Sequence, residues 1–261
     1  MKVVKFWSLC VTALLAFGVA ANAATINEIR IDQGGGDDSE YFELAGTPGE
    51  SLANVWYVVL GDTGGGTDGA NGFGNGGIVE AAVDLTGNSI ASDGFFLAVE
   101  SSFENGAGEV FEGVTPDLTA SFSFENGDNV THLLVTDFTG SLGDDLDTDE
   151  DGVLNTTPWS GVLDAVGLLE TPQPPSAAGE DFLFAVGLGG SNVGPNGTFV
   201  PAHVFRDVDG TGAFQIGAFA TGEETETPGS SNVIIPEPAS MVLVMLGATL
   251  AGMVGMRRKL G

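Results

Sequence analysis

The chain has 261 residues and a formal charge of −29, from 36 Asp and Glu side chains against 7 Lys and Arg. Nucleic acid is therefore excluded as a partner, because its binding depends on Lys and Arg contacts to phosphate. An acidic polysaccharide is disfavoured as a partner unless divalent cations bridge the two surfaces. Glycine occurs 41 times and cysteine once, so we expect short strands and turns without disulfides or thiol chemistry.

Residues 1–23 have the pattern of a secretory signal peptide. Two lysines precede an apolar run over 6–20, and the small residues at 21–23 suit signal peptidase. We expect cleavage after Ala23. Cys10 lies inside the apolar run and lacks the small neighbour that a lipoprotein signal needs, so lipidation is not expected.

Residues 24–220 are expected to form one exported all-β domain. Short apolar runs rich in β-branched and aromatic residues alternate with turns, a pattern typical of a sandwich or barrel. A Gly-rich surface loop is expected over 61–77, which lacks the helix start and the Lys of a phosphate-binding loop. The expected strands cover residues 25–31, 40–44, 55–60, 78–85, 95–99, 122–124, 130–135, 162–168 and 182–186.

Two of these strands carry specific expectations about their faces. Strict alternation in the first places Ile26 beside Glu28 on one face and leaves Ile29 on the other. Because burying a carboxylate is costly without partners, Ile26 can face inward only if Glu28 is satisfied. The uninterrupted apolar run over 55–60 predicts burial on both faces.

The densest carboxylate run, over 144–152, has the spacing of half a calcium loop. Acids stand at alternate positions, and Gly152 permits the sharp turn that such a loop needs. An EF-hand would require a bidentate Glu where Pro158 stands, so the run resembles the Asp-rich loops of thrombospondin type 3 repeats more closely. The alternative is a solvated acidic loop without an ion, and Asp207–Gly210 is expected to be a plain turn. The expected ligands are Asp147, Asp149, Asp151, the carbonyl of Val153, and Asn155.

The inventory of catalytic residues favours a protein that is not an enzyme. His132 and His203 are the only histidines, and they lack the spacing of a zinc site. His132 lies in an apolar strand, which indicates a structural role. No Gly-x-Ser-x-Gly elbow occurs. Because the chain has 36 acidic side chains, a pair of catalytic carboxylates of the glycosidase type remains a lesser alternative.

The C-terminus combines three features in a fixed order, after a polar linker over 221–235. Pro236-Glu237-Pro238 is followed by an uncharged run over 239–256 and then by Arg257-Arg258-Lys259. The run is near the minimum length of a membrane-spanning helix, which needs about 17–25 residues. The basic end should stay on the cytoplasmic side, with everything upstream outside. The exported part then has two basic side chains, Arg30 and Arg206, and 36 acidic ones, so its formal charge is −34.

This tail, over 236–261, resembles the PEP-CTERM sorting signal of Gram-negative, biofilm-forming bacteria. The resemblance implies that signal peptidase and an exosortase, a membrane-embedded cysteine protease, both act on the chain. It also implies a precursor held in the inner membrane and a mature form on the cell surface or in the extracellular matrix. The implied sorting residues are Pro236, Glu237, Pro238, Arg257 and Arg258.

A series of short motifs also runs through the first two thirds of the body. They are Ile26-Asn27-Glu28-Ile29, Glu40-Tyr41-Phe42-Glu43-Leu44 with Gly46, Leu52 and Trp56, Ser92-Asp93-Gly94-Phe95-Phe96-Leu97, Asn126-Gly127-Asp128-Asn129-Val130, and Asp164-Ala165-Val166. Their order over about 25–169 resembles the lamin tail domain, an immunoglobulin-like β-sandwich. The chain departs from that family at 61–77 and 144–159. The resemblance implies a recognition or scaffold module without catalysis.

Together these features predict an exported β-sandwich with a structural or adhesive role and calcium as its candidate cofactor. Extracellular polysaccharide or other surface proteins are the expected partners. The first alternative is a carbohydrate- or protein-binding module, which an exposed aromatic platform would favour. A secreted hydrolase ranks third and would require a cleft with two facing carboxylates.

Overall fold

The computed structural model describes residues 23–36, 38–62, 75–176, 180–197 and 199–233. Among these residues, no helix has the length and apolar character needed to cross a membrane. The expected signal peptide before Ala23 and the expected sorting tail over 236–261 lie outside the described residues.

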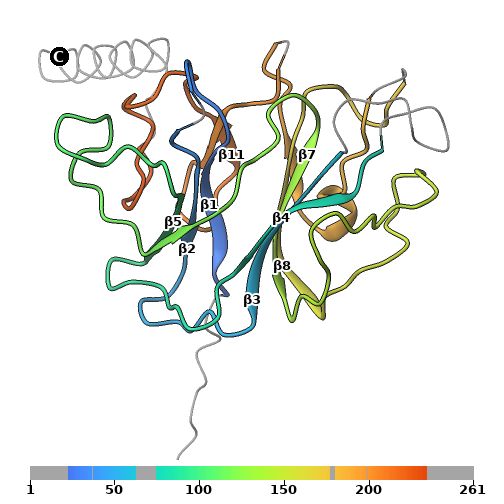
Figure 1. Ribbon diagram of the computed structural model, residues 1–261, viewed down its shortest axis with the longest axis horizontal. Coiled ribbons are helices and arrows are strands. Elements are labelled where there is room, and N and C mark those ends of the chain that lie inside the picture. Colours follow the sequence, from blue (N-terminus) through green and yellow to red (C-terminus); the bar gives the residue numbers. More distant parts are fainter. Residues whose placement is uncertain (1–22, 37, 63–74, 177–179, 198, 234–261) are drawn as a thin grey trace, which may run out of the picture.

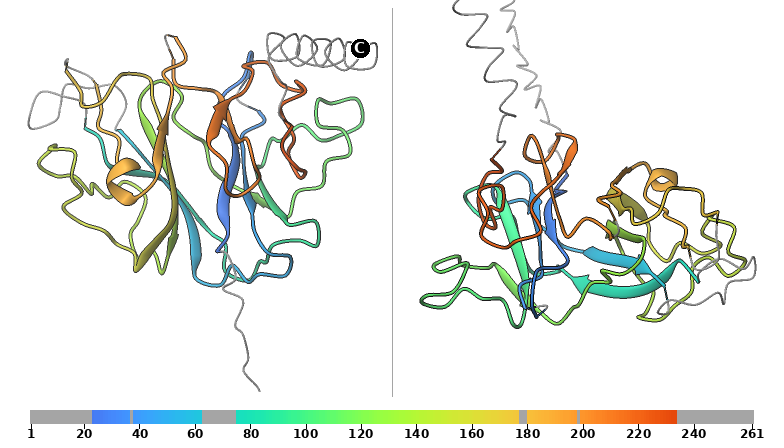
Figure 2. Two further views of the ribbon diagram at one scale, coloured as in Figure 1. Left: turned by 180° about the vertical axis from the view of Figure 1, so that it is seen from behind. Right: turned by 90° about the horizontal axis from the view of Figure 1, so that it is seen from above.

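The described residues form an all-β fold of two sheets that pack face to face, in the manner of a β-sandwich (Figure 1, Figure 2). The first sheet has six strands in the order β11-β10-β1-β2-β5-β6, and the second has five in the order β4-β3-β7-β8-β9. Both sheets are mixed, because β6 joins β5 and β9 joins β8 in parallel. In chain order the elements are β1 (Thr25–Arg30), β2 (Tyr41–Ala45), β3 (Val55–Gly61), β4 (Ile78–Asp84), β5 (Phe95–Glu100), β6 (Leu118–Ala120), β7 (Val130–Thr136), β8 (Gly161–Leu168), the 3-10 helix η1 (Val186–Leu188), β9 (Ser191–Val193), β10 (His203–Arg206) and β11 (Phe214–Ile216).

The main core lies between the two sheets. Figure 1 shows β1, β2 and β5 of the first sheet beside β3, β7 and β8 of the second. Apolar side chains from both sheets fill the space, and Phe42 of β2 stacks on Tyr57 of β3 with ring centroids 3.7 Å apart. The all-β expectation is confirmed, while the immunoglobulin-like identity of the sandwich stays a prediction.

Loops cover the outer face of the second sheet. Along β3, Tyr57 faces the main core, whereas Val58 and Leu60 belong to a second apolar cluster. Phe184 and other loop side chains complete this second cluster. Strand β3 therefore has apolar neighbours on both of its faces, which explains its uninterrupted apolar sequence. The predicted burial of this strand on both faces is confirmed.

Strand β1 departs from strict alternation. Its pairing with β2 shifts register between Ile26 and Glu28, which marks a β-bulge at Asn27. Ile26 therefore lies in the main core together with Ile29. The prediction that these two isoleucines occupy opposite faces is wrong, because the extra residue in the bulge reverses the alternation after it.

Two expected strands do not form in the described chain. Residues 122–124 lie between β6 of the first sheet and β7 of the second, so the chain crosses here from one sheet to the other. Phe122 and Phe124 stack at 4.8 Å and pack on the main core instead of joining a ladder. In the segment 182–186, Phe182, Phe184 and Ala185 pack in the second apolar cluster, and η1 begins at Val186.

The segment 221–233 packs onto the first sheet, although its composition predicts a polar linker. Arg30 and Glu226 form a fully buried ion pair. The backbone N–H and the hydroxyl of Thr227 each donate a hydrogen bond to the Glu28 carboxylate at 3.0 Å. Buried charges need partners, and those of β1 find them in this segment. The requirement that Glu28 be satisfied is thereby met.

Candidate metal centre and sorting motif

Four strand ends meet at one end of the second sheet. The antiparallel pairing sets Leu60 of β3 opposite Thr131 of β7, and Val130 of β7 opposite Leu168 of β8. Gly61 of β3 likewise lies opposite the first residue of β4. Residues that directly follow β3 and β8, or precede β7, are therefore brought together by the ladder itself.

Acidic side chains concentrate at this end. Carboxylate oxygens of Asp62, Asp128 and Asp181 lie within 4.8 Å of one another, and so do those of Asp62, Glu80 and Glu125. Asp62 belongs to both groups, so the five acids form one continuous set, which we call the sheet-end cluster. Asp62 and Asp181 are almost fully buried, with 5% and 1% of their surface exposed.

Burial and mutual repulsion raise the pKa values in the sheet-end cluster. Loss of solvent, followed by the negative charges of Glu125 and Asp62, raises the pKa of Glu80 to about 8. Loss of solvent, followed by the charges of Asp62 and Asp128, raises the pKa of Asp181 to about 8. The pKa of Asp128 rises to about 6 for the same kinds of reason. These carboxylates are unstable as bare anions in the positions that the fold gives them.

The described part of the chain offers no free cation to compensate these charges. Between residues 24 and 233 the sequence has two basic side chains, Arg30 and Arg206. Arg30 pairs with Glu226, and Arg206 pairs with Asp164 at 2.6 Å. Burial lowers the pKa of His132 to about 3, so its ring is neutral at physiological pH. Any compensation at the sheet-end cluster must therefore come from protons or from a bound cation.

The structure also brings together the acids of the predicted calcium loop. Oxygens of Asp147, Asp149 and Asp151 lie within 4.8 Å of one another. Asp147 is fully buried, and its carboxylate accepts hydrogen bonds from the backbone N–H of Gly152 at 2.9 Å and of Asp151 at 3.4 Å. Gly152 has φ +81°, which agrees with the sharp turn expected at this glycine.

The two remaining predicted ligands, the Val153 carbonyl and Asn155, stay predictions. Val153 is exposed, with 66% of its surface open to solvent. The side-chain oxygen of Asn155 already accepts hydrogen bonds from the Thr148 hydroxyl at 2.9 Å and from the Asp149 backbone N–H at 3.3 Å. Inside the loop, burial and the charges of Asp147 and Asp145 raise the pKa of Glu150 to about 7.

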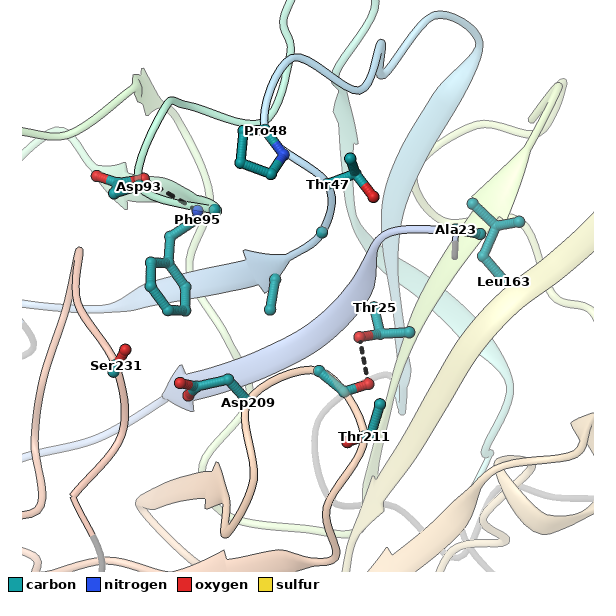
Figure 3. Close-up of a pocket in the computed structure, with 14 residues that line it drawn as sticks. Ala23, Thr25, Thr47, Pro48, Asp93, Phe95, Leu163, Asp209, Thr211 and Ser231 are labelled. Atoms are coloured by element: carbon teal, nitrogen blue, oxygen red, sulfur yellow. Dashed lines mark hydrogen bonds between the residues drawn. The ribbon is translucent and has the colours of Figure 1, made fainter. Parts of the chain in front are cut away.

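A separate open hollow lies at the start of β1 (Figure 3). It has a volume of about 740 Å³, and its titratable lining residues are Asp93 and Asp209. Asp93 accepts a hydrogen bond from the Phe95 backbone N–H at 3.0 Å, and Asp209 accepts one from that of Asn232 at 3.0 Å. Both carboxylates thus hold the backbone in place, and Phe95 is largely buried, so the hollow presents no open aromatic platform.

The sequence did not reveal the sheet-end cluster, because its members come from separate segments. The available signal was positional, since Asp62 stands two residues after the apolar run over 55–60 and Asp128 stands two residues before the run over 130–135. Among the predicted processing residues, Ala23 is exposed, and the sorting residues over 236–258 lie outside the described residues. The neighbouring Ala24 is buried, and its backbone N–H donates to Glu50 at 2.8 Å.

Comparison with known families identifies the end of the chain. Residues 235–259 match the PEP-CTERM protein-sorting motif. The chain carries a PEP-CTERM signal. Such a motif implies an exported precursor that is anchored in the membrane and sorted to the cell envelope by an exosortase. Neither the curated proteins nor the solved structures give a match to this chain, so the lamin-tail resemblance of the body stays a prediction.

Proposed function

We propose that this PEP-CTERM chain is a structural or adhesive protein of the surface or extracellular matrix of a Gram-negative bacterium. The PEP-CTERM motif at 235–259 is the observation that carries this proposal. The strongly acidic body supports it, because charge of one sign keeps a protein soluble outside the cell. In this proposal the body is a lamin-tail-like sandwich that contacts extracellular polysaccharide or other surface proteins and performs no catalysis.

The arrangement of aromatic and acidic side chains supports a structural role over the two alternatives. Trp56 and Trp159 are partly buried and pack against the second apolar cluster, so neither stands free as a platform for a sugar ring. In the hollow of Figure 3, Asp93 and Asp209 are engaged with backbone N–H groups. A hydrolase would need such carboxylates free to act as acid and base.

The sorting step is tested by replacing Pro236, Glu237 and Pro238 with alanine. We expect the altered precursor to accumulate in the inner membrane, because the tripeptide is the part of the motif that an exosortase would read. The measurement is the share of protein in inner-membrane, surface and medium fractions. The matched control is E223A/E224A, which changes two exposed acids upstream of the motif. Equal delivery of the altered and original proteins would refute exosortase sorting.

Calcium binding by the loop at Asp147, Asp149 and Asp151 belongs to the same proposal, with the carbonyl of Val153 and the side chain of Asn155 as further ligands. An ion that binds only the folded form adds about 2.7 kcal/mol to the free energy of unfolding when its concentration is a hundred times its Kd. We expect millimolar calcium to raise the melting temperature more than magnesium does, and D147N/D149N to remove part of that rise. An equal rise with calcium, magnesium and sodium chloride would indicate charge screening alone.

A further inference from the structure

We propose that Asp62, Asp128 and Asp181 of the sheet-end cluster bind a divalent cation of the calcium type. This site has other ligands than the loop at 144–152, and no sequence motif marks it. It does not depend on the sorting motif or on the occupancy of the loop. The inference rests on the spacing of the oxygens, on the burial of Asp181 without hydrogen-bond partners, and on the lack of a free counter-charge among the described residues.

The spacing of the oxygens fits one shared ion. Calcium binds carboxylate oxygens at about 2.3–2.6 Å, so two oxygens on one ion can be at most about 5 Å apart. The oxygens of Asp62, Asp128 and Asp181 lie within 4.8 Å of one another. All the side chains in the set are carboxylates, and oxygen-only sets suit hard cations such as calcium and magnesium rather than zinc.

Asp181 provides the second, independent observation. Only 1% of its surface is exposed, and neither of its carboxylate oxygens has a hydrogen-bond partner among the residues that the structure describes. One carboxylate oxygen of Asp181 nevertheless lies within 4.8 Å of carboxylate oxygens of Asp62 and Asp128. Buried polar groups in native proteins almost always have partners. A buried carboxylate that has none among the described residues, and that lies beside two other carboxylates, is well placed to be a cation ligand.

The backbone at Asp181 is held firmly in position. Its carbonyl accepts hydrogen bonds from the side-chain amides of Asn129 at 2.9 Å and Gln173 at 2.8 Å. Three residues on, the Phe184 backbone N–H donates to the Thr131 hydroxyl at 3.1 Å. Asn129 and Thr131 flank the first residue of β7. These hydrogen bonds therefore connect the segment 181–184 to the start of β7, which Asp128 precedes. The aspartate is thus placed by the fold and not by chance contact at a mobile surface.

Calcium fits the surrounding charge better than magnesium does. Glu80 and Glu125 also lie within 4.8 Å of Asp62, so further carboxylates border the site. Calcium accepts six to eight oxygens in flexible geometry, whereas magnesium demands an octahedron and retains its water. Extracellular modules bind calcium with Kd values of about 10⁻⁴–10⁻³ M, which suits a protein that reaches the cell envelope.

The ion would add a link between the end of the second sheet and the segment that covers its outer face. Asp62 follows β3, Asp128 precedes β7, and Asp181 belongs to the segment that packs on the second apolar cluster. One ion bound by all three would fasten that covering segment to the end of the sheet. Calcium binding should therefore stabilise the packing of the outer face of the second sheet, and with it the folded state.

The test uses the full-length chain in detergent, in a D147N/D149N background that disables the neighbouring loop. Calcium stoichiometry is measured by equilibrium dialysis, and the melting temperature is followed with calcium, magnesium or sodium chloride at equal ionic strength. We expect one calcium per chain and a calcium-specific rise in melting temperature. D181N should remove both, because an amide cannot replace the carboxylate charge. D128N is a second variant at a less buried ligand, in case D181N does not fold.

The matched control is D137N, which removes an exposed acid after β7, at the opposite end of the same sheet. It should bind calcium as the parent does. Retention of calcium binding and of the melting shift in both D181N and D128N would overturn the proposal. So would a rise in melting temperature that is equal for all three salts, because it would reflect screening. Failure of exosortase sorting would leave these readouts unchanged, so the two proposals fail independently.

Discussion

Acidification should destabilise the fold through His132. This histidine lies on β7, is fully buried, and has its Nδ1 atom 2.9 Å from the Tyr57 hydroxyl. Its Nε2 atom has no hydrogen-bond partner among the described residues. Burial lowers the pKa of the ring to about 3, since no nearby charge favours the protonated form in that position.

The size of the effect follows from linkage. In the unfolded chain the imidazole binds a proton near pH 6.5, whereas in the folded chain it stays neutral down to about pH 3. The unfolded state therefore binds more protons between these values, and stability falls as the pH falls. The loss is about 1.4 kcal/mol per pH unit below 6.5, or about 2 kcal/mol at pH 5. Above pH 7 the contribution is fully present.

The assay is denaturant unfolding from pH 7.5 to pH 5 on the original chain and on H132Q. Glutamine keeps a polar group near Tyr57 but does not titrate, and acids with raised pKa values, such as Glu80, contribute equally to both proteins. The free-energy difference between the two proteins should therefore shrink by about 2 kcal/mol toward pH 5. Parallel stability curves over this pH range would refute the argument that burial keeps His132 neutral.

Two further predictions concern strain and buried charge. G152A should cost about 1–3 kcal/mol, because φ is +81° and an added Cβ would lie 2.5 Å from the Phe182 ring. G187A, where an added Cβ meets nothing within 4 Å, should change the free energy of unfolding little, and equal losses in the two variants would contradict the strain argument. R30M or E226M should each cost about 3–5 kcal/mol by leaving one buried charge unpaired. The double variant should recover much of that loss, and strictly additive losses would show that the two side chains do not depend on each other.

The candidate metal sites show which parts of a site can be read from a sequence. Asp147, Asp149 and Asp151 were predictable as a group, because alternate residues of one short loop need only local curvature to converge. Asp62 and Asp181 were not predictable as a pair. They meet only after β3 has paired with β7 and the segment 181–185, which contains Asp181, has packed against the second sheet. Segment 221–233 was misread for a similar reason. Its composition is that of a linker, and the partners of Glu226 and Thr227 lie on β1, far away in the sequence.

The sequence by itself determined the PEP-CTERM motif and the all-β class, because each depends on residues that are neighbours in the chain. A sorting motif is read as a linear peptide, and the apolar character of 55–60 follows from its own composition. Tertiary structure decided the bulge at Asn27, the crossing at 122–124 and the sheet-end cluster. These depend on which strands pair and in which register. Pairing energies arise between residues that are remote in sequence, so a local pattern cannot encode them.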